Sequence, residues 1–414
     1  MFALAADIYL HETEHFRDLF LCLGPFYWTR VLLRCQGKLL RGSGPDDALI
    51  ECGVFGPGVI ESVLNGSHYV RALTGMLIVE DLSHTLQLQA FWTHKDKVTY
   101  PMLEQMKELQ SMLAANERCP EQFKVINGQI EQLHRDFLEF EKECETKSEL
   151  CHFFGVWLQL VAVVKNAVVS DREGNWNLHV ATVEDSMQIF AEYDCINYLR
   201  YGSWYLEQIE VMEFAHPELY RRFSIGHWVV QDPPGWFCSA GGDMKVEQTI
   251  QRVSKGPGGH YVVGEIRNAG AVAEFELVFH NIGSITNLLN LLTTNKPMDH
   301  TECHLQHALS TTRRHTFNQN VVKLLDYVLE RQNPYTVTVS VPVSLHNLLK
   351  KLAVDREVAA RLLKWLENGE RVYRSYRQER LVEKTQKISA TISKRKLSMF
   401  TDQPKRQHQH QKPF

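Results

Sequence analysis

The chain has 414 residues, of which 44% are hydrophobic and 23% are charged. These fractions are typical of a globular protein with a full apolar core, and they exclude a largely disordered chain. The formal net charge of −4 at pH 7 points by itself to no particular partner.

The first residues, Met1 to Asp7, contain no basic side chain and reach an acid before a signal-peptide core could form. The most apolar stretch, 153–164, is shorter than the roughly 20 residues that cross a bilayer. The nine cysteines are scattered without a C-x-x-C pair, which favours reduced thiols over a disulfide framework. We therefore expect an intracellular protein of the nucleus or cytoplasm that does not contact membranes.

The sequence predicts a mainly α fold, with a multi-helix globular body, a few short strands and a basic, partly disordered C-terminal tail. In the N-terminal segment (1–101), an apolar run over 16–28 ends at Gly24-Pro25 and predicts a buried strand. Apolar residues at spacings of three and four predict helices over 29–40 and 57–95. The next segment, 102–150, is charge-rich, is broken at Pro120 and carries two apolar stripes, so it predicts an amphipathic helical hairpin.

The segment 151–335 forms the predicted helical core, and the segment 336–393 follows with a strand and a basic helix. Glycine and proline clusters predict that 226–264 is a looped region with one short helix. The alternating residues 335–341 predict a strand, and 394–414 is expected to be disordered. The predicted helices of these segments cover 152–169, 176–193, 198–214, 244–253, 281–293, 303–331 and 345–385, the last with a break near 368–369.

Four groups of motifs occur one after another along the chain. They are Leu-Gly-Pro-Phe-Tyr at 23–27 with Gly-Ser-Gly at 42–44; Arg-Glu-Gly-Asn-Trp-Asn-Leu-His at 172–179 with Asn-Tyr-Leu-Arg-Tyr at 197–201; Gly-His-Trp-Val-Val at 226–230 with Asp243 and Glu247; and Thr-Arg-Arg at 312–314 with Asn-Pro-Tyr at 333–335 and Lys-Arg-Lys-Leu-Ser-Met-Phe at 394–400. Over about residues 5–402, this set resembles a family of large, uncharacterised animal proteins associated with transposable elements. Members of that family bear a distant likeness to RNase H-like transposases, in which carboxylates hold two divalent metals.

The sequence departs from this family in two ways. Relatives carry a long region before the first motif, whereas here that motif begins at Leu23, so a carboxylate supplied by an upstream strand is absent. Tyr27 stands where relatives have His, and a phenol with a reference pKa of about 10 is a poor ligand or base near neutral pH. The resemblance therefore implies an N-terminally truncated member that has lost its chemistry.

Asp243 and Glu247 are the candidate catalytic and metal-binding residues. They are four residues apart at the start of a predicted helix, so their carboxylates would share one face and could hold Mg²⁺ or Mn²⁺. In the alternative interpretation, Asp243 caps its helix and Glu247 is solvated in the first turn. A second cluster, His300, Cys303, His304 and His307, has zinc-compatible spacing but lacks a second pair of ligands, so a solvated helix face is the default.

Arg172, Trp176 and His179, together with Asn197, Arg200 and Tyr201, could line a ligand site. The interpretation that we favour is a buried polar network that fixes two helices, with Trp176 and Tyr201 in the core.

Charge is unevenly distributed along the chain. From Arg371 to Phe414 there are twelve Lys or Arg against three acidic residues, a net charge of +9, which leaves −13 on residues 1–370. A basic segment of this kind could follow a phosphate backbone, and a solvated charged helix is the alternative. The candidate nucleic-acid-binding residues are Arg371, Arg374, Arg377, Arg380, Lys394, Arg395 and Lys396.

The first functional hypothesis is a transposon-derived protein without catalytic activity, which needs no cofactor and binds DNA or RNA through the basic segment. One alternative is a residual nuclease that depends on Mg²⁺ or Mn²⁺ at Asp243 and Glu247. The other is a helical scaffold that binds another protein through 102–147. The sequence leans against an enzyme without deciding the question.

Overall fold

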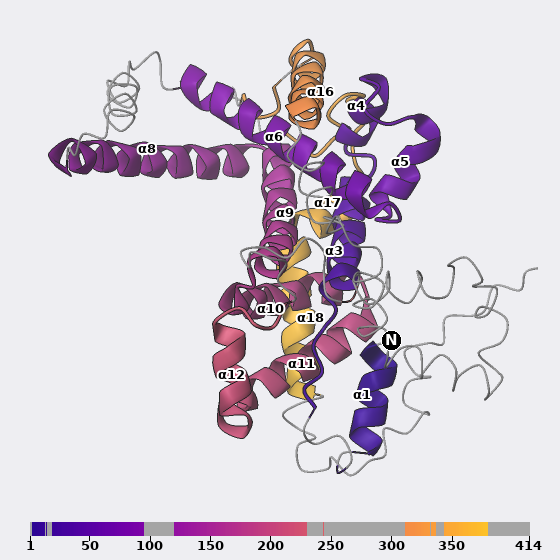
Figure 1. Cartoon of the computed structure of the whole chain (residues 1–414). Helices are drawn as coiled ribbons and strands as arrows, with labels where there is room; N and C mark the ends of the chain where they lie inside the picture. The colour runs from indigo at the N-terminus through magenta and orange to yellow at the C-terminus, as the bar shows by residue number, and fades with distance from the viewer. Residues whose placement is uncertain are drawn as a thin grey trace, which may run out of the picture.

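In the computed structural model of the chain, the described residues are 2–12, 14, 19–94, 120–229, 243, 311–331, 333–336 and 343–379. They form helices and, apart from these, two isolated β-bridges, so the predicted mainly α fold is confirmed (Figure 1). The helices are α1 (Phe2–His11), α3 (Pro25–Leu40), α4 (Pro45–Glu51), α5 (Pro57–Leu64), α6 (Tyr69–His94), α8 (Pro120–Lys147), α9 (Glu149–Glu173), α10 (Trp176–Glu192), α11 (Ile196–Ala215), α12 (Pro217–Ser224), α16 (Thr311–Leu329), α17 (Arg356–Leu363) and α18 (Trp365–Arg377).

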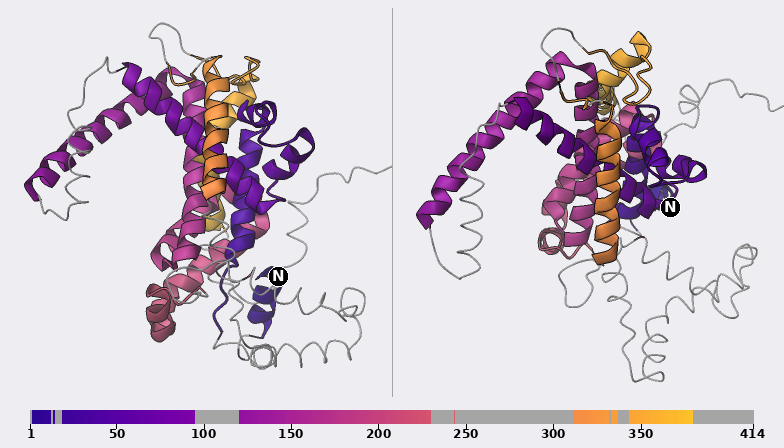
Figure 2. Two further views of the ribbon diagram at one scale, coloured as in Figure 1. Left: turned by 45° about the horizontal axis from the view of Figure 1, so that its top comes forward. Right: turned by 90° about the horizontal axis from the view of Figure 1, so that it is seen from above.

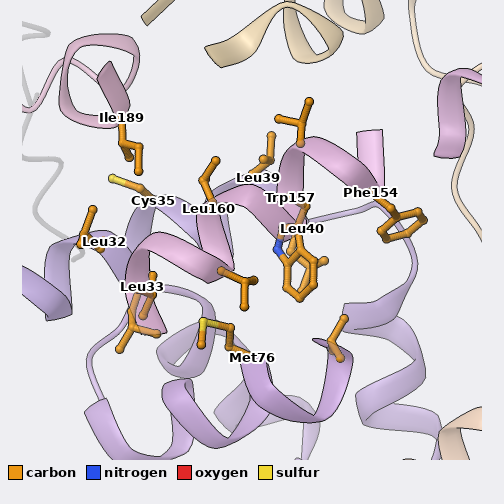
Figure 3. Packing of buried hydrophobic residues seen from close by; sticks show 14 of the residues in the cluster. Leu32, Leu33, Cys35, Leu39, Leu40, Met76, Phe154, Trp157, Leu160 and Ile189 are labelled. Atoms are coloured by element: carbon orange, nitrogen blue, oxygen red, sulfur yellow. The ribbon is translucent and has the colours of Figure 1, made fainter. Parts of the chain in front are cut away.

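Helix α9 is the centre of the body and packs against α3, α6, α8, α10 and α17. It begins at Ser148, whose side chain accepts a hydrogen bond from the Cys151 N–H and thereby satisfies one of the free donors of the first turn. Trp157 in its middle is fully buried, and it lies among leucines of α3 in the close view of the core (Figure 3). Helices α9 and α3 therefore share a closely packed part of the apolar core.

By composition alone, α9 is long and apolar enough to cross a membrane, with a mean hydropathy of 1.6 over its most apolar window. Half of that window is buried by neighbouring helices, and Lys165 on α9 binds the buried carboxylate of Glu80 on α6 at 2.7 Å. A helix in the core of a protein, covered by neighbouring helices, has the same apolar composition as α9.

The second helix of the predicted amphipathic pair is confirmed as α8, whereas the first lies outside the described residues. Phe137 and Phe140 on α8 pack against Phe91 on α6, with ring centroids 5.4 and 5.5 Å apart. Towards its N-terminus, α8 extends past the end of α6 and away from the body (Figures 1 and 2). Ile130, on the same apolar stripe, is consequently 39% exposed.

Two predictions near the chain ends were wrong. Residues 19–24 form no strand, and α3 begins at Pro25, because a proline is well suited to the first position of a helix. The predicted helix over 345–385 begins only at Arg356 and is interrupted at Lys364 instead of 368–369. Ahead of α17, the side chain of Asn347 stabilises a turn, since its Oδ1 accepts hydrogen bonds from the N–H groups of Leu349 and Lys350.

Helix α18 is fixed along α10 by close backbone contact. A Cβ on Gly369 would lie 2.2 Å from the carbonyl oxygen of Gln188, so only glycine allows this approach. Trp365 at the start of α18 is 3% exposed, and its ring contacts that of Tyr193 at an interplanar angle of 58°, with ring centroids 4.9 Å apart. The N-terminal part of α18 is therefore held against the body.

Candidate functional site

Asp243 binds the N-terminus of α3, which carries the first sequence motif. Its two carboxylate oxygens accept hydrogen bonds from the N–H groups of Phe26 and Tyr27, each at 3.2 Å. The preceding residue, Gly24, has no side chain with which to cap these donors, and Pro25 occupies the first helical position. Asp243, more than 200 residues away in the sequence, thus supplies the cap of α3.

The approach of Asp243 depends on the glycine of the motif. A Cβ on Gly24 would lie 2.5 Å from Asp243 Oδ2, so a larger residue there would displace the carboxylate. The negative charge also lies at the positive end of a 16-residue helix, where the macrodipole stabilises it. Two motifs that the sequence analysis singled out for separate reasons therefore form one structural unit.

Aromatic and charged side chains surround this cap. Burial raises the pKa of Tyr69 to about 12, Arg172 lowers it, and the carboxylates of Asp171 and Asp243 raise it further. Burial, with a smaller contribution from Asp243, also raises the pKa of Tyr198. Both phenols stay protonated at neutral pH, so they cannot act there as bases. Among the described residues, the arrangement holds the carboxylate of Asp243 beside two protonated phenols.

The metal interpretation of Asp243 gains little from this geometry. Glu247, its predicted partner, lies outside the described residues, as does the cluster of His300, Cys303, His304 and His307. Among the residues that the structure describes, no group of three His, Cys, Asp or Glu side chains is arranged to hold a metal ion. Asp243 has a structural role as the cap of α3, and the helix predicted over 244–253 lies outside the described residues.

We expect Asp243→Ala to reduce the free energy of unfolding by about 1 kcal/mol, because two N–H donors of α3 lose their acceptor. Asp243→Asn keeps an acceptor oxygen and should lose less. Urea unfolding of both variants checks this. Stabilisation of the unsubstituted protein by Mn²⁺, absent in Asp243→Asn, would contradict a purely capping role and support metal binding.

Of the predicted polar network, Trp176 and His179 form a buried packing unit, whereas Asn197 is exposed and Arg172 and Arg200 are only partly buried. His179 is buried, and its Nε2 lies 3.1 Å from the hydroxyl of Tyr205. Trp176 and Trp228 pack around the same imidazole, at ring-centroid distances of 5.4 and 4.2 Å. Tyr201 is 9% exposed and belongs to the core, as expected. Tyr205, the direct partner of His179, was not singled out because its sequence context carries no motif.

The space beside His179 does not suit a substrate. A cavity of about 10 Å³ lies there between α3 and α10, which is room for about one water molecule. Burial lowers the pKa of His179 to about 3, so the imidazole is neutral at physiological pH. This cluster therefore fixes α10 to α11 and to Trp228, and it does not form a ligand site in the described structure.

The arginines of α18 are exposed, but they do not form an uninterrupted basic ridge. Arg374 pairs with Glu370 one turn earlier, and Arg377 lies 3.4 Å from Glu210 on α11. Across residues 365–379, three arginines are balanced by Glu367, Glu370 and Glu379. The excess positive charge of the C-terminal segment therefore begins at Arg380, and Arg380, Lys394, Arg395 and Lys396 lie outside the described residues.

Comparison with known families gives one assignment. A family model described as a domain of unknown function, DUF8702, matches residues 1–405. The chain belongs to the DUF8702 family. No curated protein and no solved structure matches it. The match covers every motif named above, and the resemblance to transposon-associated proteins stays a prediction beside it.

Proposed function

We propose that this DUF8702 protein binds nucleic acid through residues 380–414 and acts without catalysing a reaction. The observation that carries the proposal is the separation of charge. Residues 380–414 hold nine Lys or Arg and two acidic residues, a net charge of +7, on a protein whose formal charge is −4. Such a basic segment attracts the phosphate backbone and releases its counterions. A nuclear location and a transposon origin belong to the same proposal.

The fold supports this function by fixing α18, the helix that precedes the basic segment, against the body. Helix α18 is fixed to α10 by Gly369 and Trp365, so a strand of nucleic acid bound by 380–414 would remain next to the body. The acidic remainder of the chain repels phosphate and confines contact to the segment. Surface ion pairs such as Arg377 with Glu210 are weak, and they reduce the local positive potential of α18.

Two variants separate the segment from α18. A chain ending at Glu379 keeps all of α18 and should bind DNA or RNA at least about tenfold more weakly at ~0.1 M salt. The triple variant Arg371→Ala, Arg374→Ala, Arg377→Ala should lose much less, because Arg374 and Arg377 pair with glutamates and Arg371 bonds to Asn368. Fluorescence anisotropy with labelled oligonucleotides measures both. Full affinity in the shortened chain would overturn the proposal.

A further inference from the structure

Two cysteines that are far apart in the sequence lie in contact at the junction of α3 with α11. The Sγ atoms of Cys35 and Cys195 are 4.0 Å apart, and 160 residues separate them along the chain. Cys35 is 1% exposed, whereas Cys195 is only partly buried, in the turn between α10 and α11. In the close view, Cys35 lies beside Ile189 and Leu39 in the core (Figure 3). The pair thus consists of an enclosed thiol and a thiol that solvent can reach.

The surroundings of Cys195 favour its thiolate. It is the residue at which α11 begins, near the positive end of that helix. The hydrogen bond with Cys35 lowers the pKa of Cys195 to about 7, with help from Arg34 and Lys38 and against burial and Asp194. The same hydrogen bond, together with burial, raises the pKa of Cys35. Cys195 is therefore the nucleophile of the pair, and Cys35 carries the proton.

The turn that presents Cys195 is held from both sides. The ammonium group of Lys38 lies 5.5 Å from the centre of the Tyr193 ring. Trp365 on α18 also contacts that ring. Asp194, between Tyr193 and Cys195, has a positive φ of 54°. These contacts keep the two sulfur atoms close together, and a disulfide requires them to approach from 4.0 Å to about 2.05 Å.

We propose that Cys35 and Cys195 are a redox modification site, at which a hydroperoxide converts the two thiols into a disulfide. The Cys195 thiolate attacks one peroxide oxygen; an S–O bond forms, the O–O bond breaks, and the leaving oxygen takes a proton to become an alcohol or water. The Cys35 sulfur then attacks the Cys195 sulfenic acid; the S–S bond forms, the S–O bond breaks, and water leaves with the Cys35 proton. Two thiols are oxidised and one hydroperoxide is reduced.

The other thiol pair of the described structure is a natural comparison. Cys144 and Cys151 are both buried, and their thiols donate hydrogen bonds to the carbonyl oxygens of Tyr335 and Pro334. A peroxide in solvent cannot reach either sulfur without local opening. Oxidation should therefore select the pair of Cys35 and Cys195.

Peptide mapping of the reduced, full-length protein after treatment with hydrogen peroxide tests this site. We expect the loss of two thiols and a cross-linked peptide that joins Cys35 to Cys195 and disappears with dithiothreitol. In Cys35→Ser, the Cys195 sulfenic acid should accumulate and react with dimedone. In Cys195→Ser, Cys35 should stay reduced. A disulfide between any other two cysteines, or no disulfide, overturns the proposal.

A second measurement needs no variant. Cys52 is partly buried like Cys195, but burial raises its pKa. At pH 7, iodoacetamide should therefore modify Cys195 at least about tenfold faster than Cys52 in the unsubstituted protein. Equal rates would show that Cys195 is not an activated thiol and would contradict the assignment.

Discussion

Gly37→Ala is expected to reduce the free energy of unfolding by about 3 kcal/mol, because the helices on either side of it leave no room for a methyl group. Gly37 lies in the middle of α3, and a Cβ there would be 2.1 Å from the carbonyl oxygen of Leu64 at the end of α5. The clash is with backbone, so α5 itself must move. Urea unfolding monitored by tryptophan fluorescence gives the difference in stability.

The matched control is the same substitution at Gly128. This residue lies inside α8, and a Cβ there meets nothing within 4 Å. Gly128→Ala should stabilise the protein by up to about 1 kcal/mol, because alanine favours the helix more than glycine does. If both variants were stabilised, α3 and α5 would not be in the close contact described here.

Acidification from pH 6.5 to pH 5 is expected to cost about 2 kcal/mol of stability through His179 alone. Burial lowers the pKa of this imidazole to about 3 in the folded protein, against 6.5 for an unperturbed side chain. Between these values the unfolded chain binds a proton that the folded one does not. The contribution of His179 is therefore complete above pH 6.5 and is lost as the pH falls towards 3.

His179→Gln isolates this effect, because glutamine can still bond to Tyr205 and does not titrate. The variant should be less stable at pH 7.5, and its stability should change less between pH 6.5 and pH 5. The difference between the two pH profiles removes the contributions of other groups, such as His84, whose pKa is raised by Glu80. Parallel profiles would contradict the buried, neutral state of His179.

Helices whose ends are marked by capping or helix-breaking residues could be predicted from the sequence. Gly174 ends α9 with a positive φ of 66°, the Asn175 side chain caps α10, and Pro217 begins α12 after α11 has ended. Such signals act within a few residues, so the boundaries of α9, α10 and α11 came out nearly right. Pro25 is an equally local signal for the start of α3, but the apolar residues around it predict a buried strand instead.

Residues 19–24 of that apolar run have no regular structure and are only partly buried: Leu23 is 6% exposed, whereas Leu19 is 52% exposed. Phe20 packs against Tyr205 and Phe223, with ring centroids 6.0 and 5.9 Å apart. Short apolar runs do not distinguish a buried strand from an irregular segment, because both need the same side chains. Contacts between distant elements decide such cases, and they leave no periodic pattern.

In the candidate site, too, local features could be predicted from the sequence and contacts between distant elements could not. A carboxylate at Asp243 could be singled out from its sequence context, but its partner at the start of α3 lies 216 or 217 residues away. The pairing of Arg374 with Glu370 follows from helical spacing and could be predicted, whereas that of Arg377 with Glu210 needs the docking of α18 near α11. These ion pairs thus narrow the segment expected to bind nucleic acid from residues 371–414 to residues 380–414.

The salt dependence of binding tests the proposed function most directly. If residues 380–414 bind the phosphate backbone through several of their nine basic side chains, log K for a DNA duplex should fall linearly with log salt, at a slope steeper than about −4. The chain ending at Glu379 should lose most of that slope. A flat salt dependence in the full-length protein, or an equal slope in the shortened chain, would contradict nucleic-acid binding by this segment.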